Sequence, residues 1–209
     1  MNETFNPEFE SYETEKILDL FNLSPEQEVD LKGDIKLFKG LVRIFVHPFY
    51  EQLERGGSEF REQGMNKVRK GIKRIINSTH ENVPPLIFME EETRINDIRQ
   101  ELKPELAHRA YLVPTYEGTS EPRLTSIDNP LENVGENWSR LINRLNGLGV
   151  SKVLIGGMWL EIGDKFLEEK TGLYGCVGDA VNHLKQDFEV QVSNLNFPDS
   201  RKEYQESQE

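Results

Sequence analysis

Leu41-Val-Arg-Ile-Phe-Val46 is a short apolar run, and the polar side chain of His47 follows it directly. Three further runs of this kind occur along the chain, and stretches with helical periodicity separate them. They are Pro85–Met89, Ala110–Val113 and Lys152–Ile155. Continuous apolar strands separated by helices are typical of a parallel sheet that is buried on both faces. With a further strand at Phe188–Val192, the sequence predicts a three-layer, doubly wound α/β fold. Its mainly parallel sheet should have about five strands and helices on both faces.

The chain is expected to divide into three parts. Residues 1–38 form an acidic N-terminal segment with short helices, 39–198 a single α/β domain, and 199–209 a disordered polar tail. Residues 114–135 are rich in Pro, Thr, Ser, Gly and Glu and predict a long loop. Helices are expected at Glu15–Leu23, from Pro25 to about Phe38, and at Met65–Ser78, Glu90–Leu102, Asn137–Leu148, Leu160–Lys170 and Cys176–Lys185.

Charge and cysteine content narrow the classes of function. The chain has 209 residues, and 37 acidic against 25 basic residues give a formal charge of −12. This balance disfavours general binding of nucleic acid or of anionic membranes. The single cysteine excludes an internal disulfide. In the absence of a signal peptide or an apolar membrane span, the expected location is cytoplasmic. Homo-oligomerisation stays open.

Polar residues that follow the strands are the candidates for a site, because ligands collect at the carboxyl edge of such sheets. Cys176 is expected at a helix N-terminus, where it could act as a nucleophile or fill space as a small buried side chain. His47, held extended by Pro48, could be a general base, a metal ligand or a hydrogen-bonded residue of a turn. Glu90 could orient another group or transfer a proton, or it could cap a helix.

A second set of residues is expected to line the same edge and to contact a ligand. Tyr50 would add a phenol, and Trp159 a ring beyond the Gly156-Gly157 strand exit. The other members of this set are Thr115, Glu117 and Glu161. The sequence has neither Gly-x-Gly-x-x-Gly after the first strand nor Gly-Lys-Ser/Thr, so no nucleotide cofactor is indicated and the cofactor stays unknown.

Three segments together resemble the C-terminal part of isochorismatase-like cysteine hydrolases. They are Gly149-Val-Ser-Lys-Val-Leu-Ile-Gly-Gly157, Gly175-Cys-Val-Gly-Asp-Ala-Val-Asn-His-Leu184 and Phe188-Glu-Val-Gln-Val192. The resemblance implies a doubly wound α/β fold, a Cys176 nucleophile and hydrolysis of amides, imides or a vinyl ether. The chain departs from the family in three places. Residues 158–174 are inserted, His47 stands where the family has an aspartate, and no lysine follows the third strand.

These observations lead to three functional hypotheses. The first is a small-molecule hydrolase of carbon–nitrogen or similar acyl bonds, in which Cys176 is the nucleophile, His47 the base and Glu90 an orienting carboxylate. The second is a non-catalytic α/β module that binds a ligand or a protein at the same edge. The third is a metal-dependent enzyme that uses His47 and nearby carboxylates.

Overall fold

The computed structural model describes residues 17–48, 59–77, 83–102, 109–117, 119–124, 134–162 and 173–198. Within these ranges the chain forms one seven-stranded sheet. The strands are β1 (Leu18–Asp19), β2 (Leu41–Val46), β3 (Leu86–Glu91), β4 (Ala110–Thr115), β5 (Lys152–Ile162), β6 (Leu173–Tyr174) and β7 (Glu189–Pro198). The helices are α1 (Pro25–Leu37), α2 (Glu59–Ile76), α3 (Ile95–Glu101), α5 (Val134–Leu148) and α6 (Gly175–Leu184), with a 3₁₀ turn at Glu92–Arg94. The predicted tail at 199–209 lies outside the described residues.

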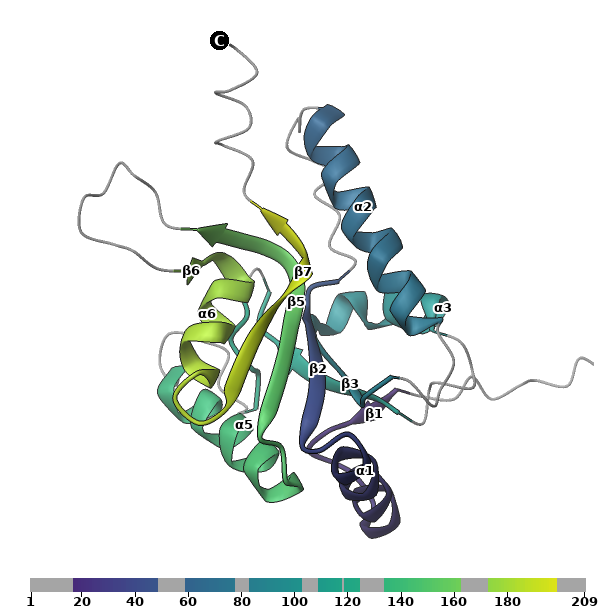
Figure 1. The fold of residues 1–209 in the computed structure, drawn as a ribbon, viewed down its shortest axis with the longest axis vertical. Helices are drawn as coiled ribbons and strands as arrows, with labels where there is room; N and C mark the ends of the chain where they lie inside the picture. Colours follow the sequence, from purple (N-terminus) through teal and green to yellow (C-terminus); the bar gives the residue numbers. More distant parts are fainter. Residues whose placement is uncertain are drawn as a thin grey trace, which may run out of the picture.

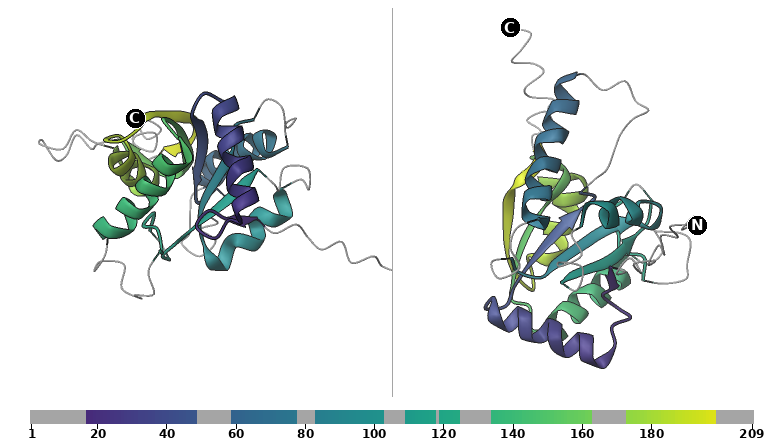
Figure 2. Two further views of the ribbon diagram at one scale, coloured as in Figure 1. Left: turned by 90° about the horizontal axis from the view of Figure 1, so that it is seen from below. Right: turned by 90° about the vertical axis from the view of Figure 1, so that its right-hand side faces the viewer.

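The sheet is parallel apart from one short strand. Its order is β1-β4-β3-β2-β5, with β7 parallel to β5, and β6 pairs antiparallel with the end of β5. Figures 1 and 2 show α5 and α6 on one side of this sheet and α2 and α3 on the other. The predicted three-layer α/β fold is confirmed. The two-residue strands β1 and β6 raise the number of strands above the expected five.

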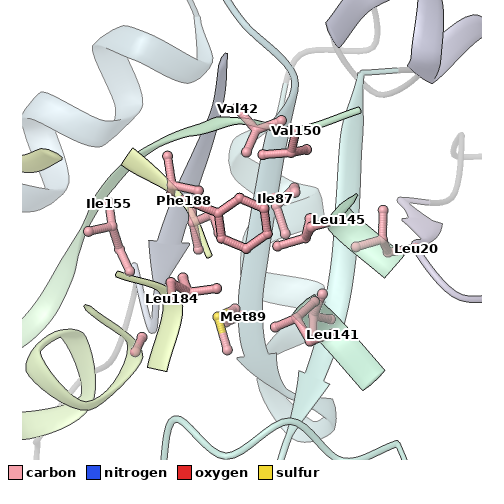
Figure 3. Packing of buried hydrophobic residues seen from close by; sticks show 14 of the residues in the cluster. Leu20, Val42, Ile87, Met89, Leu141, Leu145, Val150, Ile155, Leu184 and Phe188 are labelled. Carbon is pink, nitrogen blue, oxygen red and sulfur yellow. The ribbon is translucent and has the colours of Figure 1, made fainter. Parts of the chain in front are cut away.

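Successive side chains of each strand point to opposite faces of the sheet, and they pack into two separate cores. On one face Val42, Ile44 and Val46 of β2 pack with Leu141 and Leu145 of α5 and with residues of α1 and α6. Figure 3 shows part of this cluster around Met89, Leu184 and Phe188. On the other face Phe45 and Phe88 stack with ring centroids 5.9 Å apart, beneath Ile72 of α2. Because both faces are buried, the strands read as unbroken apolar runs in the sequence.

The N-terminal segment differs from its prediction. Leu18–Asp19 is a strand that pairs with β4, so the helix expected at Glu15–Leu23 is wrong over its described residues. The apolar residues there are used instead for burial, since Leu20 lies in the core and its amide donates to the Leu112 carbonyl at 3.0 Å. The next helix is confirmed as α1. Ser24 and Gln27 form a reciprocal capping box at its start.

The fourth predicted strand does not end at the Gly156-Gly157 pair. β5 continues to Ile162, so the helix expected from Leu160 is wrong at residues 160–162, and 163–172 lie outside the described residues. Gly157 passes the backbone of Val46 so closely that a Cβ at this position would overlap the Val46 carbonyl. Its φ of 141° is in addition one that other residues rarely adopt. Gly157 thus serves close strand packing rather than a turn.

Two other predicted element boundaries differ in the structure. β4 ends at Thr115, which forms an isolated antiparallel bridge with Pro122, so the loop expected at 114–135 begins with paired backbone. The helix that follows starts at Val134 instead of Asn137. Among the described helices, none combines the length and the apolar composition needed to cross a membrane.

Candidate functional site

His47 and Glu90 meet because β2 and β3 are parallel neighbours. Val46 is paired with Met89, and the His47 amide donates to the Met89 carbonyl at 3.0 Å. The residues that follow this pair therefore lie side by side at the carboxyl edge of the sheet. Glu90 belongs to β3 itself and is fully buried, so its reading as a capping residue at the start of a helix is wrong.

Both ring nitrogens of His47 face hydrogen-bond acceptors. Nδ1 lies 2.9 Å from Glu90 Oε1, and Nε2 lies 2.9 Å from the carbonyl oxygen of Thr119. A carbonyl oxygen can only accept and an ionised carboxylate can only accept, so both nitrogens donate when the ring carries two protons. The side chains of His47 and Glu90 are 2% and 0% exposed, so solvent barely screens the pair.

Cys176 is the third member of this group. It is the second residue of α6, and it is half-buried. Because α6 leads into β7, which runs parallel to β5, its N-terminus lies at the same edge as His47. Burial alone lowers the pKa of His47. Hydrogen bonds to Cys176 and Glu90 and the negative charges of these two groups outweigh burial and raise the pKa to about 10. The ring is therefore an imidazolium at neutral pH.

The backbone at His47 is strained. Its φ is 47°, a left-handed value at which histidine is more common than most residues but which still costs on the order of 1 kcal/mol. The sequence prediction that Pro48 holds His47 extended is therefore wrong. Pro48 disfavours the right-handed helical region, and the chain uses the left-handed one to turn the ring toward Glu90. Strain of this kind is concentrated at functional positions.

The structure places the remaining candidates from the sequence as follows. Thr115 is buried in β4 opposite Glu91, and its hydroxyl has no hydrogen-bond partner among the described residues. Glu117 is exposed. Tyr50 lies outside the described residues. Trp159 and Glu161 belong to β5, where Glu161 pairs with Tyr174 of β6, but their side chains are not among those described.

Three residues near this edge were not expected from the sequence. Thr119 contributes only its carbonyl oxygen, which no side-chain pattern reveals. Glu121 and Asn137 are buried at 6% and 0% exposure. Burial raises the pKa of Glu121 to about 7, against the opposing effect of hydrogen bonding to Asn137 and Trp138. A glutamate in a polar loop and an asparagine near the start of a helix normally face solvent, so neither gave a signal.

The described part of the chain contains no group of three or more His, Cys, Asp or Glu side chains placed to hold a metal ion. In the arrangement of Cys176, His47 and Glu90, the carboxylate is hydrogen-bonded to one nitrogen of the ring, and the ring also contacts the sulfur. Comparison of the chain with protein-family models, with curated proteins and with solved structures finds no match in any of the three.

Proposed function

We propose that this protein is a hydrolase that cleaves a carbon–nitrogen or similar acyl bond of a small molecule with Cys176 as the nucleophile. The observation that carries the proposal is the contact of His47 with both Cys176 and buried Glu90. Nucleophile, base and orienting carboxylate are the three parts that such chemistry needs. The resemblance to isochorismatase-like cysteine hydrolases carries over Cys176 alone as the nucleophile, since the family's aspartate and lysine have no counterpart in this chain.

The charge on His47 defines its part in the first step. Cys176 attacks the acyl carbon as the thiolate and forms a carbon–sulfur bond while His47 carries the proton. In this mechanism, the backbone amides at the start of α6 stabilise the resulting oxyanion. His47 then gives its proton to the leaving nitrogen as the carbon–nitrogen bond breaks. This releases the amine and leaves a thioester.

Water completes the reaction. Neutral His47 takes a proton from the attacking water, the carbon–sulfur bond breaks, and a carboxylic acid leaves while Cys176 returns to the thiolate. Glu90 accepts the hydrogen bond from Nδ1–H throughout, so the other side of the ring can serve the substrate. The Thr119 carbonyl occupies Nε2–H in this structure and must release it if that proton is the one transferred.

The hydrogen bond between His47 Nε2 and the Thr119 carbonyl favours a second candidate function, the non-catalytic binding module. If Thr119 holds Nε2–H permanently, both ring nitrogens are engaged in the protein and His47 only fixes the 119–121 turn. Glu90 and His47 would then form a buried structural pair. The two candidates differ in what they require of Cys176, because only a hydrolase needs a reactive sulfur.

Alkylation by iodoacetamide tests the proposal. At pH 7 the native protein should be labelled at Cys176 at least about tenfold faster than the same chain in denaturant, because the nucleophile of a cysteine hydrolase must be a reactive sulfur. His47→Asn should abolish this advantage while tolerating the left-handed backbone, since asparagine also adopts it. Cys176→Ser is the control for specific labelling. Labelling that occurs only after denaturation would contradict the hydrolase and favour the binding module.

A second measurement follows the covalent intermediate. Incubation with p-nitrophenyl acetate should release a burst of nitrophenol and leave an acetyl group on Cys176, which mass spectrometry of the intact protein detects. The His47→Asn variant should show neither the burst nor the adduct. Slow release without an adduct, equal in the wild type and in Cys176→Ser, would show that the sulfur takes no part.

A further inference from the structure

Helix α1 has an exposed face that carries apolar side chains. Val29 and Leu37 are 67% and 70% exposed, and no other large hydrophobic side chain in the described part of the chain is exposed. Gly33 lies midway between them and is exposed as well. Because residues four apart are neighbours on a helix surface, the three positions form one stripe. The stripe lies on the side of the helix opposite Leu31 and Ile35, which are buried in the core.

The glycine in the middle of this stripe is not required by the packing of the chain itself. A Cβ built at Gly33 would meet no atom within 4 Å. A glycine in the interior of a helix costs about 1 kcal/mol relative to alanine. At an exposed position it also allows another backbone to approach closely. A second helix that crosses α1 at Gly33 would cover Val29 and Leu37 on either side of the crossing.

Two oppositely charged side chains flank the stripe. Asp30 and Lys36 are both exposed, and neither forms an ion pair within the described residues. Other charges of the same helix are paired within the chain, since Glu28 lies 2.7 Å from Lys32 and 2.6 Å from Arg144. The exposed face of α1 thus combines uncovered apolar side chains with one acidic and one basic group that remain available to a partner.

The order of these residues makes the face complementary to itself. In an antiparallel pair of α1 helices related by a two-fold axis at Gly33, residues equally far before and after Gly33 face each other. Asp30 lies three residues before Gly33 and Lys36 three residues after it, so each Asp30 faces a Lys36 of the other copy. Val29 and Leu37 lie four residues before and after it, so they meet across the same axis.

We propose that α1 is the contact surface of a homodimer in which the α1 helices of two copies cross antiparallel at Gly33. In the right-hand view of Figure 2, α1 lies along the lower end of the molecule with the sheet above it, so a second copy can approach this face. Helix α1 leads into the start of β2, whereas His47 follows the end of β2. The candidate site therefore lies at the opposite edge of the sheet and stays open in the dimer.

The size of this surface sets the strength of the dimer. The 13 residues of α1 span about 20 Å at 1.5 Å per residue. One face of such a helix offers less than the roughly 800 Å² per partner that stable interfaces bury. Each exposed ion pair adds only about 0.2–1 kcal/mol, which is at most about fivefold in affinity. The dimer should therefore be weak, with a Kd on the order of 100 µM.

Sedimentation equilibrium of the full chain, from about 5 µM to about 1 mM, tests the proposal. The wild type should change from monomer to dimer over this range. Leu37→Asp should raise the Kd at least about tenfold, because it places a charge in the apolar contact twice. Circular dichroism should show that this variant is folded, since position 37 is exposed. Lys70→Asp, at an exposed position of α2, is the matched control and should dimerise as the wild type does.

Charge exchange tests the antiparallel arrangement. Asp30→Lys and Lys36→Asp each place like charges opposite one another twice, so each should raise the Kd at least about fivefold. General repulsion between chains of charge −12 predicts the opposite for Asp30→Lys, which makes the chain less negative. The double variant Asp30→Lys/Lys36→Asp only exchanges the two partners and should dimerise as the wild type does.

Three results would overturn the proposal. The first is a wild type that stays monomeric up to about 1 mM, which would leave this face of α1 to a different protein. The second is a dimer whose Kd is unchanged by Leu37→Asp and by both single charge variants, which would place the contact elsewhere. The third is a double variant that is no tighter than Asp30→Lys or Lys36→Asp alone, which would exclude the antiparallel pairing.

Discussion

The Nδ1 of His47 lies 2.9 Å from the Oε1 of Glu90, and both side chains are withdrawn from solvent. Two residues 43 positions apart in the chain are joined in this way by the pairing of β2 with β3. Glu90 Oε1 also accepts the Glu91 amide at 3.0 Å, which fixes the carboxylate before it meets the ring. The arrangement favours the protonated form of the His47 ring.

The first prediction concerns the charge state of His47. Burial lowers its pKa, but Cys176 and Glu90 together raise it to about 10, so the ring should stay protonated well above pH 8. Glu90→Gln removes one of these charges and should bring the titration of the ring down toward the neutral range. Ring ¹⁵N chemical shifts measured from pH 5 to 10.5 report the pKa of His47 in the wild type and in Glu90→Gln.

His183 provides an internal comparison in the same spectra. Burial lowers its pKa, against the smaller opposing effect of Asp179, so its ring should titrate below the usual 6.5. If His47 titrates near 6.5 in the wild type, or if Glu90→Gln leaves its titration unchanged, the described ion pair does not exist in solution.

The second prediction is the effect of the same pair on stability. The folded pKa of His47 lies above its unfolded value of 6.5. The stabilisation is therefore fully present below pH 6.5 and is lost as pH rises through about 10. Urea denaturation at pH 6 and pH 10 should show this loss in the wild type. Glu90→Gln should be less stable at pH 6 by about 2 kcal/mol and should show a smaller loss between the two pH values. An equal loss in both proteins would contradict the assignment.

The sequence predicted the strands, and from them the shared edge, because burial on both faces leaves unbroken apolar runs such as Leu41–Val46. The end of this run placed His47 directly after a strand, and the position of Cys176 after Gly175 placed it at the start of a helix. It did not predict that β5 runs on to Ile162, because Gly156-Gly157 normally signals a turn. The close approach of Gly157 to Val46 is a property of the paired strands and is absent from local sequence.

The parts of the site that escaped sequence analysis are those that depend on tertiary contacts. The left-handed conformation of His47 is chosen by its partners, since Pro48 only removes the helical alternative. The Thr119 carbonyl has no side-chain signature. Asn137 faces inward although it stands in an amphipathic helix whose polar residues generally face solvent. Burial of a single polar residue can be recognised only after its neighbours are known.

The third prediction concerns Glu121. Its folded pKa of about 7 lies above the ordinary value of 4.5, so the native state holds a proton that the unfolded chain has already released. Stability from this group is therefore present below about pH 4.5 and declines as pH rises through 7, by on the order of 2 kcal/mol. Glu121→Gln stays neutral at all pH values and should remove this decline from urea denaturation curves measured between pH 5 and pH 8. Glu136→Gln, at an exposed position of α5, is the matched control. A decline that persists in Glu121→Gln would assign it to another group.

The last prediction tests the close packing of β2 against β5. Gly157→Ala places a Cβ against the Val46 carbonyl and forces a φ of 141° on a residue that rarely adopts it. The two effects together should lower the free energy of unfolding by about 3 kcal/mol or more. Because Val46 directly precedes His47, the shift of β2 should also slow alkylation of Cys176 in molecules that remain folded.

Gly33→Ala is the matched control, since Gly33 lies within α1 with nothing within 4 Å of the added Cβ. That variant should gain about 0.5–1 kcal/mol through helix propensity and should keep the wild-type alkylation rate. Equal stability of the two variants would show that β2 and β5 are not held as closely as described.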